Sequence, residues 1–473
     1  MPRLCVFALF AALLGFGLRE SSAAERPNVL FIAVDDLNDW IGCLGGHPDG
    51  QSPNIDALAA RGLLFEKSYC SAPACNPSRV ALLTGMRPST TGVYVNPQPW
   101  RPVLKDAVTL PQHFMANGYH AVGCGKIFHG AYDDDASWHE YLKKGGDPKP
   151  SQQVLADPHS KAGGIVWGVL DVDDSQMNDY RMADYAIDYL QQSHDKPFFL
   201  ACGIYRPHMP WQVPRAYYDL FPPEKVTLPK VLAGDLDDVP PAGVRMAQPN
   251  GDHATIQKTD NWRYAVQAYL ASIKFADAQV GRLIKALDES EYAKNTIIVL
   301  WGDHGWHLGE KEHWRKFSLW EEACRAPLMI VAPGVTRAGS RSPRTVDFVD
   351  LYPTLSELCG LPIGDHLDGD SLVPLLKNPN ADWSTPALTT HGIGNHSVRS
   401  ERWRYTRYAN GDEELYDHDA DPMEWKNLAS DPTLKSVKQD LARWIPTKDA
   451  PEAPYDAGTK RAGGGKRKAQ KKR

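Results

Sequence analysis

A short stretch around Cys75 combines a reactive side chain with the sequence signals of a helix. Asn76 suits the N-cap, Pro77 the first helical position and Gly85 a left-handed C-cap, so a short helix is predicted with Cys75 just ahead of it. A side chain at position 75 then faces unpaired backbone N–H groups and the positive end of the helix dipole. This environment favours an anion, whether a thiolate, an alkoxide or the oxyanion of a bound substrate.

Two strongly apolar segments, residues 28–34 and 295–302, are each followed at once by polar side chains. Both are predicted to be strands buried in a parallel sheet, and ligands of open α/β sheets bind at the carboxyl ends of such strands. Carboxylate oxygens suit Ca²⁺ or Mg²⁺, whereas imidazole usually prefers softer ions. A single aspartate there could equally cap a helix, but several at one edge favour a metal site. The side chains predicted to bind a metal at this edge are the carboxylates Asp35, Asp36 and Asp303, with the imidazole of His304 beside them.

Two more predicted strands, residues 119–125 and 198–204, lead into basic and imidazole side chains, and residues 326–332 form a further apolar strand. Helical periodicity marks the segments between them, at residues 110–117, 182–192 and 269–287. This alternation predicts an α/β fold with a large mixed, mostly parallel sheet flanked by helices. Lys126 and His129 follow the strand at residues 119–125, and Arg206 and His208 follow the strand at residues 198–204.

The two ends of the chain differ in composition from the rest. Residues 1–24 have one early cation, an apolar run too short to span a bilayer and small residues near the end, which predicts a secretory signal peptide and a secreted or periplasmic protein. No later stretch predicts a transmembrane segment. Residues 25–377 are expected to form the catalytic domain and 378–450 a small C-terminal α+β subdomain, and the basic, glycine-rich residues 451–473 are expected to be a disordered tail.

Charge and cysteine content limit the classes of partner. The net charge of -6 gives no global signal for nucleic acid, so none is predicted as a partner. Eight cysteines are present, but apart from Cys75 and the one in the signal peptide their spacing is irregular. We predict no specific disulfide and expect mostly buried free thiols.

The spacing Cys75-x-Pro77-Ser78-Arg79, followed by Leu-Thr-Gly, resembles the signature of type I, formylglycine-dependent sulfatases of the alkaline phosphatase superfamily. Further motifs resemble the iduronate-2-sulfatase branch, in which an Asp-His pair stands where many sulfatases carry asparagine. The similarity covers nearly the whole chain after the signal peptide. These motifs are residues 125–129, 206–210, 303–310 and 314–318.

The resemblance implies a modified nucleophile and a metal. Cys75 is then oxidised to formylglycine (3-oxoalanine) by a formylglycine-generating or sulfatase-maturating enzyme. One Ca²⁺, or alternatively Mg²⁺, is bound by the strand-end aspartates, by His304 and by the hydrated side chain that replaces Cys75. The substrate implied is a sulfated carbohydrate. A 2-O-sulfated iduronate is the leading expectation.

Roles for the remaining motif residues follow from what cleavage of a sulfate ester requires. The site must neutralise sulfate oxygens, present a nucleophile and protonate the departing alcohol. Lys126 and Lys316 are expected to hold the sulfate oxygens, and Arg79 to hold one hydroxyl of the hydrated aldehyde. His208 is the expected acid for the leaving group, and His129 the base that deprotonates the remaining hydroxyl.

A second set of side chains is expected to contact the substrate, through cations that recognise a uronic-acid carboxylate. A local excess of positive charge in a protein that is acidic overall fits an anion with more than one charge. This set comprises Trp100, Arg101, Arg206, His307 and Arg315.

Two other functions are compatible with the sequence. A phosphomonoesterase or phosphodiesterase of the same superfamily would share the fold, but the histidines of a second metal site are not evident. A non-catalytic binder of sulfated glycans would not require a nucleophile together with a proton donor. We therefore expect a sulfuric ester hydrolase.

Overall fold

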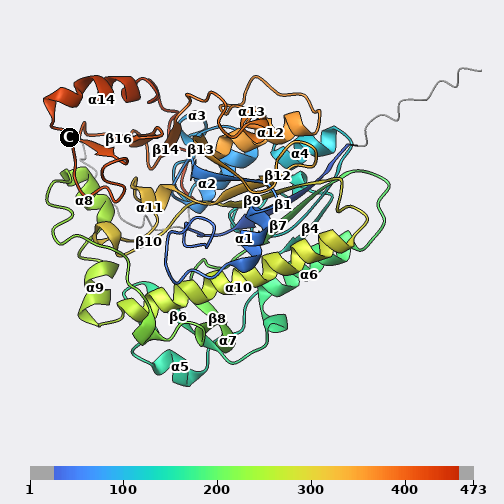
Figure 1. Ribbon diagram of the computed structural model, residues 1–473, viewed down its shortest axis with the longest axis horizontal. Helices are drawn as coiled ribbons and strands as arrows, with labels where there is room; N and C mark the ends of the chain where they lie inside the picture. Colours follow the sequence, from blue (N-terminus) through green and yellow to red (C-terminus); the bar gives the residue numbers. More distant parts are fainter. Residues whose placement is uncertain (1–25, 457–473) are drawn as a thin grey trace, which may run out of the picture.

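An eight-stranded sheet forms the centre of the protein, whose computed structural model describes residues 26–456 (Figure 1). The strand order is β13-β2-β12-β9-β1-β7-β3-β4, and β12 alone runs antiparallel to its neighbours. The predicted mixed, mostly parallel sheet is confirmed. The strands are β1 (Asn28–Val34), β2 (Leu63–Tyr69), β3 (His120–Gly125), β4 (Glu140–Lys143), β7 (Phe198–Ile204), β9 (Thr296–Gly302), β12 (Leu328–Val331) and β13 (Ser340–Asp347).

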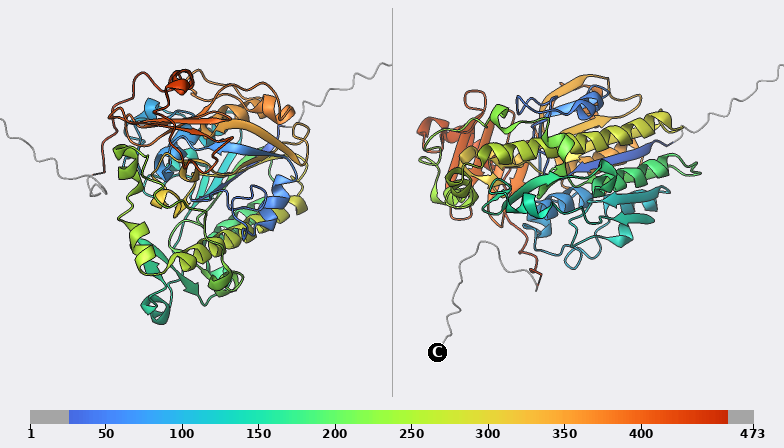
Figure 2. Two further views of the ribbon diagram at one scale, coloured as in Figure 1. Left: turned by 60° about the vertical axis from the view of Figure 1, so that its left-hand side comes forward. Right: turned by 90° about the horizontal axis from the view of Figure 1, so that it is seen from below.

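Helices cover both faces of this sheet, as its strands, apolar on both faces, require (Figures 1 and 2). One face packs against α1 (Pro53–Ala59), α6 (Asn178–Leu190) and the long α10 (Trp262–Glu289). The other face packs against α2 (Cys75–Thr84), α4 (Leu110–Ala116) and α12 (Leu351–Leu358). Smaller helices are α3 (Pro88–Thr91), α5 (Gln152–Ala156), α7 (Arg215–Tyr218), α8 (Pro241–Ala247), α9 (Asp252–Lys258), α11 (Glu321–Cys324) and α13 (Val373–Lys377).

The register of the parallel strands aligns their carboxyl ends. Val34 of β1 is level with Gly302 of β9 and with Ile204 of β7. Gly125 of β3 is level with Gly203 of β7 and with Lys143 of β4. The first residues after five neighbouring strands therefore lie in one row along a single edge of the sheet.

A four-stranded antiparallel sheet forms the expected small C-terminal subdomain and lies at the left-hand side of Figure 1. Its last strand leads to α14 (Lys435–Ala442). The boundary at residue 378 stays a prediction. The strands are β14 (Ala387–Thr390), β15 (His396–Arg399), β16 (Trp403–Arg407) and β17 (Glu413–Asp417).

Residues 451–456, which were expected to begin a disordered tail, pack against the catalytic part of the protein. The Ala453 N–H donates to the Gly92 carbonyl at 2.8 Å, and Ala453 is buried. The expected signal peptide and the basic residues 457–473 lie outside the described residues. Within residues 26–456, no helix is both long enough and apolar enough to span a bilayer.

Several short elements were not predicted from the sequence. Strands β2, β4 and β13 are part of the central sheet. The stretch 131–164 contains short helices and strands, and the stretch 229–260 contains the helices α8 and α9. Two minor sheets complete the fold, and the cysteines within the described residues are free thiols, as expected. The minor sheets consist of β5 (Lys161–Ala162), β6 (Ile165–Leu170) and β8 (Trp211–Pro214), and of β10 (His307–Leu308) and β11 (Trp314–Arg315).

Candidate functional site

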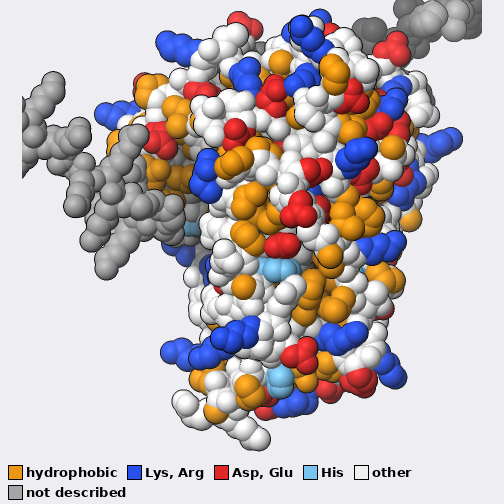
Figure 3. Space-filling model, turned by 90° about the vertical axis from the view of Figure 1, so that its left-hand side faces the viewer, with side chains coloured by type: hydrophobic (Ala, Val, Ile, Leu, Met, Phe, Trp, Pro, Cys, Tyr) orange, Lys and Arg blue, Asp and Glu red, His pale blue; other side chains and the backbone are white. Residues whose placement is uncertain are grey.

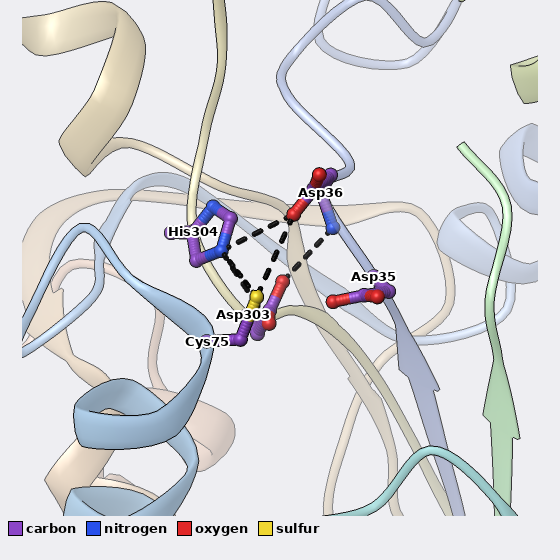
Figure 4. A group of neighbouring side chains, drawn as sticks. All are labelled: Asp35, Asp36, Cys75, Asp303 and His304. Carbon is purple, nitrogen blue, oxygen red and sulfur yellow. Dashed lines mark hydrogen bonds and ion pairs between the residues drawn. The ribbon is translucent and has the colours of Figure 1, made fainter. Parts of the chain in front are cut away.

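The structure brings all five predicted metal ligands together at the carboxyl edge of the sheet (Figure 4). Asp35 and Asp36 follow β1, Asp303 and His304 follow β9, and Cys75 comes from the start of α2. All five side chains are buried, and one ligand atom from each lies within 4.8 Å of the others. The prediction of one cluster from two strand ends and one helix start is confirmed.

Cys75 is the first residue of α2 and does not precede the helix. Ala74 occupies the N-cap position, so Asn76 lies inside the first turn and is not the cap that the sequence predicted. Gly85 closes the helix with a φ of 69°, as predicted. Only the start of the helix is displaced, because backbone geometry rather than a capping side chain begins it.

The Cys75 sulfur faces cations but stays protonated. Its Sγ lies 3.0 Å from Lys316 Nζ, 3.3 Å from His304 Nε2 and 3.5 Å from Lys126 Nζ. Burial outweighs the two lysines and raises the pKa of the Cys75 thiol to about 12. Of the anions that the sequence allows at this position, a thiolate of unmodified Cys75 is therefore disfavoured, and a neutral buried thiol is a weak nucleophile.

Asp36 has a left-handed backbone that is uncommon for a non-glycine residue, with a φ of 59°. Its N–H donates to Asp303 Oδ1 at 2.9 Å, and its carbonyl accepts from the Tyr269 hydroxyl at 2.7 Å. These bonds hold its carboxylate in the cluster, where Oδ1 accepts from Lys316 Nζ at 2.6 Å. Burial and the nearby Asp35 and Asp303 raise the pKa of Asp36 to about 7, even beside Lys316.

Arg79 lies beneath the cluster and holds its aspartates. Its Nε donates to Asp303 Oδ2 at 2.9 Å and its Nη2 to Asp35 Oδ1 at 3.1 Å, while its Nη1 donates to the backbone carbonyls of Lys126 and Ile127. The guanidinium is fully buried. These hydrogen bonds orient the carboxylates of Asp35 and Asp303, and the expected contact of Arg79 with a hydroxyl of the hydrated aldehyde stays a prediction.

Lys126 and Lys316 reach the cluster from two segments that are distant in the chain. Lys126 follows β3 and pairs with Asp35 Oδ2, and Lys316 lies in a loop in which both Arg315 and Phe317 have positive φ, of 82° and 77°. Such strained backbone persists where the surrounding contacts over-determine it. Although burial opposes the charge, nearby carboxylates raise the pKa of both lysines, so both carry positive charge beside Cys75.

The donor set fits a hard divalent cation. Asp36 Oδ2 is buried and has no hydrogen-bond partner among the described residues, so it is available to a ligand. The His304 Nδ1 lies 2.9 Å from the Gly305 carbonyl oxygen; because that oxygen can only accept, Nδ1 carries the proton and donates it. Its Nε2 then offers a lone pair to the cluster, and burial lowers the pKa of His304 to about 4. Carboxylate oxygens predominate, as Ca²⁺ and Mg²⁺ prefer.

The two candidate acid–base histidines lie beside this cluster. The His208 Nδ1 lies 2.6 Å from the Met209 carbonyl, which leaves Nε2 free, 3.9 Å from Asp36 Oδ2. Burial and Lys126 together lower the pKa of His208 well below its usual value and that of His129 to about 3. Both rings are neutral near pH 7 in the free protein, so His208 can act as an acid only when a bound anion offsets Lys126.

Four of the five predicted substrate contacts serve internal structure, which corrects the expectation. Trp100 is 1% exposed and stacks on Phe128 with ring centroids 5.3 Å apart. Arg101 forms two hydrogen bonds to Asp134, at 3.0 Å and 2.5 Å. Both side chains stabilise the loop that follows α3.

The other two internally committed side chains are Arg206 and His307. Arg206 is 1% exposed and its Nη2 lies 2.8 Å from Asp147 Oδ2, while His307 is fully buried and bonded to the Ser318 hydroxyl at 2.8 Å. Arg315 is 30% exposed at its side chain but is also paired, with Asp252 at 2.6 Å. The proposed carboxylate clamp therefore does not form from these residues.

Two side chains that the sequence did not indicate lie beside the site. The ring of Tyr205, the first residue after β7, lies 4.6 Å from that of His208, and Lys144 Nζ lies 3.1 Å from the centroid of Tyr205. Both directly follow strands of the central sheet. Had residues 140–143 been predicted to be a strand of the sheet, Lys144 would have been placed at the same edge as the other site residues.

Comparisons with known proteins agree with this geometry. The sequence model of the family described as "Sulfatase" matches residues 27–361, and that of "N-sulphoglucosamine sulphohydrolase, C-terminal" matches residues 309–449. The chain is 39% identical over 447 residues to a sulfatase of Formosa agariphila, covering 90% of this chain and 87% of that protein. It is 31% identical to human iduronate 2-sulfatase, covering 88% and 94% of the two chains.

The fold also matches solved structures. Phosphonate monoester hydrolase of Agrobacterium radiobacter superposes with a TM-score of 0.73 at 24% identity, covering 88% of this chain and 94% of that chain. At this identity the likeness shows the fold alone. The predicted alkaline-phosphatase-like architecture is confirmed.

Proposed function

Because this chain belongs to the sulfatase family and is a sulfuric ester hydrolase, we propose that it removes sulfate from a sulfated, uronic-acid-containing oligosaccharide or polysaccharide. One observation supports this most directly: Cys75 Sγ lies 3.0 Å from Lys316 Nζ and 3.5 Å from Lys126 Nζ at the carboxyl edge of the sheet. A group attached at position 75 thus faces two charged lysines that suit a sulfate monoanion. Similarity to iduronate 2-sulfatase supports the choice of sugar.

The nucleophile in this proposal is formylglycine, formed from Cys75 by a formylglycine-generating or sulfatase-maturating enzyme. The neutral thiol with its pKa of about 12 supports the need for a different group. Ca²⁺, or Mg²⁺, held by Asp35, Asp36, Asp303, His304 and the side chain at position 75 would supply positive charge beside the sulfate and favour the ionised hydroxyl. Three carboxylates face three cations in the protein, so this ion gives the site a net positive charge for an anionic substrate.

The residues of the chain then have separate roles in two displacements. Lys126 and Lys316 bind sulfate oxygens, and one hydroxyl of the hydrated aldehyde forms a bond to sulfur as the ester S–O bond breaks. His208 donates a proton from Nε2 to the departing alcohol. His129, whose Nδ1 is buried without a partner among the described residues, takes the proton of the second hydroxyl. Release of sulfate then restores the aldehyde, which water hydrates again.

Export is part of the same proposal. The composition of residues 1–24 supports a signal peptide, and a secreted or periplasmic location would give access to extracellular polysaccharide.

Two measurements test the proposal. Mass spectrometry of the peptide that contains residue 75 should find formylglycine in active protein; only thiol in a fully active preparation contradicts the mechanism. Multiple-turnover release of sulfate from an aryl sulfate should exceed release of phosphate from the matched aryl phosphate, and sulfate should also be released from a 2-O-sulfated uronate. Faster phosphate release would indicate a phosphoesterase, and binding without turnover by formylglycine-containing protein would indicate a glycan-binding protein.

A further inference from the structure

A row of side chains along the carboxyl edge of the sheet continues beyond the catalytic cluster. Lys126 and Lys144 are the first residues after β3 and β4, whose last residues Gly125 and Lys143 are paired in register. The edge strand β4 therefore delivers Lys144 to the same level as the lysine that contacts Cys75. Strand register, rather than a flexible loop alone, fixes where Lys144 emerges.

Three cations surround one aromatic ring in this row. Lys144 Nζ lies 3.1 Å from the centroid of Tyr205, Lys126 Nζ 5.3 Å and Arg206 Cζ 5.3 Å. The separation of Lys144 Nζ and Lys126 Nζ is therefore at most the sum of their distances from the ring centroid. This separation is on the scale of one sugar ring and its substituents, and the Tyr205 ring also contacts His208, with centroids 4.6 Å apart.

The three cations differ in their partners. Lys126 pairs with Asp35, and Arg206 is buried and pairs with Asp147. Lys144 is exposed and has no ion-pair partner within residues 26–456. Burial is the main cause that lowers the pKa of Lys144; Arg206 and Lys126 add to this shift, and the carboxylates of Asp147 and Asp179 oppose it. One nitrogen of Arg206, Nη1, is also buried without a partner among the described residues.

The cations of this row do not belong to a generally basic surface. Acidic and basic side chains are interspersed on the face shown in Figure 3, and the chain has a net charge of -6. A solvent-accessible, unpaired ammonium among other cations attracts an anion.

We infer that Lys144 binds a second anionic group of the substrate, a carboxylate or a neighbouring sulfate, while Lys126 and Lys316 hold the sulfate that is cleaved. The inference rests on the proposed function and replaces the clamp predicted from Arg101, Arg206, His307 and Arg315. Lys144 is a specificity-determining residue in this account. Tyr205 positions it by supporting the ammonium group on its ring face.

The test compares Lys144→Met with Lys143→Met in the metal-loaded, formylglycine-containing enzyme. Lys143 is the matched control, because it precedes Lys144 on the same strand but is 57% exposed and pairs with Asp135 at 2.9 Å. Substrates are a 2-O-sulfated uronate, the matching neutral 2-O-sulfated hexose, and a disulfated neutral sugar with its monosulfated parent. The first pair reports on a carboxylate and the second on a neighbouring sulfate.

Lys144→Met should raise KM about 10-fold for one of the doubly charged sugars, namely the one whose second anion Lys144 binds. This is the effect expected from the loss of one charged hydrogen bond in a partly exposed site. The kcat for that sugar and the kcat/KM for singly charged sugars should change less than about 2-fold, and Lys144→Arg should retain the preference. Equal losses on singly and doubly charged sugars, or no loss on either doubly charged sugar, would overturn the inference. If the unaltered enzyme releases no sulfate from any of these sugars, the proposed function is refuted instead.

Discussion

Substitution of Arg79 by methionine tests the charge balance beneath the active site. Arg79 is fully buried between two carboxylates, with its nitrogens 2.9 Å from Asp303 and 3.1 Å from Asp35. Methionine replaces much of the side-chain volume but leaves these carboxylates without their shared cation. Removing one partner of a buried ion pair costs about 3–5 kcal/mol, because the remaining charge is left uncompensated.

A further loss comes from the backbone. Arg79 Nη1 donates to the carbonyls of Lys126 and Ile127, and each buried acceptor left unpaired costs about 1–3 kcal/mol. We therefore expect Arg79→Met to lower the free energy of unfolding by about 5 kcal/mol or more, a large part of the about 5–15 kcal/mol typical of native proteins. As a surface control, Arg61→Met removes a pair with Asp288 whose side chains are 33% and 46% exposed, and should cost at most about 1 kcal/mol.

Urea denaturation followed by tryptophan fluorescence, with a chelator present so that no added cation offsets the carboxylates, measures the difference. In the Arg79→Met background, Asp303→Asn should restore part of the lost stability, since it removes a buried carboxylate that has lost its arginine partner, whereas Asp35 still pairs with Lys126. If Arg79→Met is too unstable to purify, Arg79→Lys, which keeps the charge but not the fork of donors, should give a smaller loss. The reasoning is refuted if Arg79→Met and Arg61→Met are equally stable, or if Asp303→Asn lowers the stability of Arg79→Met further.

Three further results are expected. His208→Gln should lower kcat/KM on a sugar sulfate by about 10²–10⁴-fold but affect an activated aryl sulfate far less, because a good leaving group does not need the proton; equal losses in a steady-state comparison would exclude His208 as the acid. Chelation should abolish sulfate release, and titration with Ca²⁺ or Mg²⁺ should restore it, whereas restoration by Zn²⁺ alone would show that His304 determines the metal class. Arg101→Met should leave the preference for a carboxylated sugar unchanged, since Arg101 is paired with Asp134; a lost preference in the same kinetics would return it to the substrate site.

Local sequence patterns were sufficient for the centre of the fold and of the site. The apolar strand β1 and the strand β9 end at Val34 and Gly302, as expected from the aspartates that follow, because a charged pair is costly inside a sheet but favourable at its edge. Parallel register then places both ends together without further information. The motif around Cys75 supplied the third component, and its closing glycine has the predicted left-handed backbone.

Strands with less regular composition escaped prediction. Strand β4, residues 140–143, is short, mostly exposed and follows a loop-rich stretch, so neither apolar continuity nor length distinguishes it. Its pairing with β3 makes it a strand, and that pairing is a property of the assembled sheet.

The protonation of Cys75 and the partners of the cations were decided by tertiary structure. A helix start favours a thiolate, yet complete burial of Cys75 outweighs that effect, and burial depends on every element packed around it. Whether an arginine is free or paired depends on contacts such as that of Arg206 with Asp147, which are 59 residues apart in the chain. The sequence by itself therefore determined which side chains could perform the chemistry. Only the folded structure decided which cations, Lys144 among them, remain available to a substrate, because an ion pair between distant segments removes a charge from the site without any local trace in the sequence.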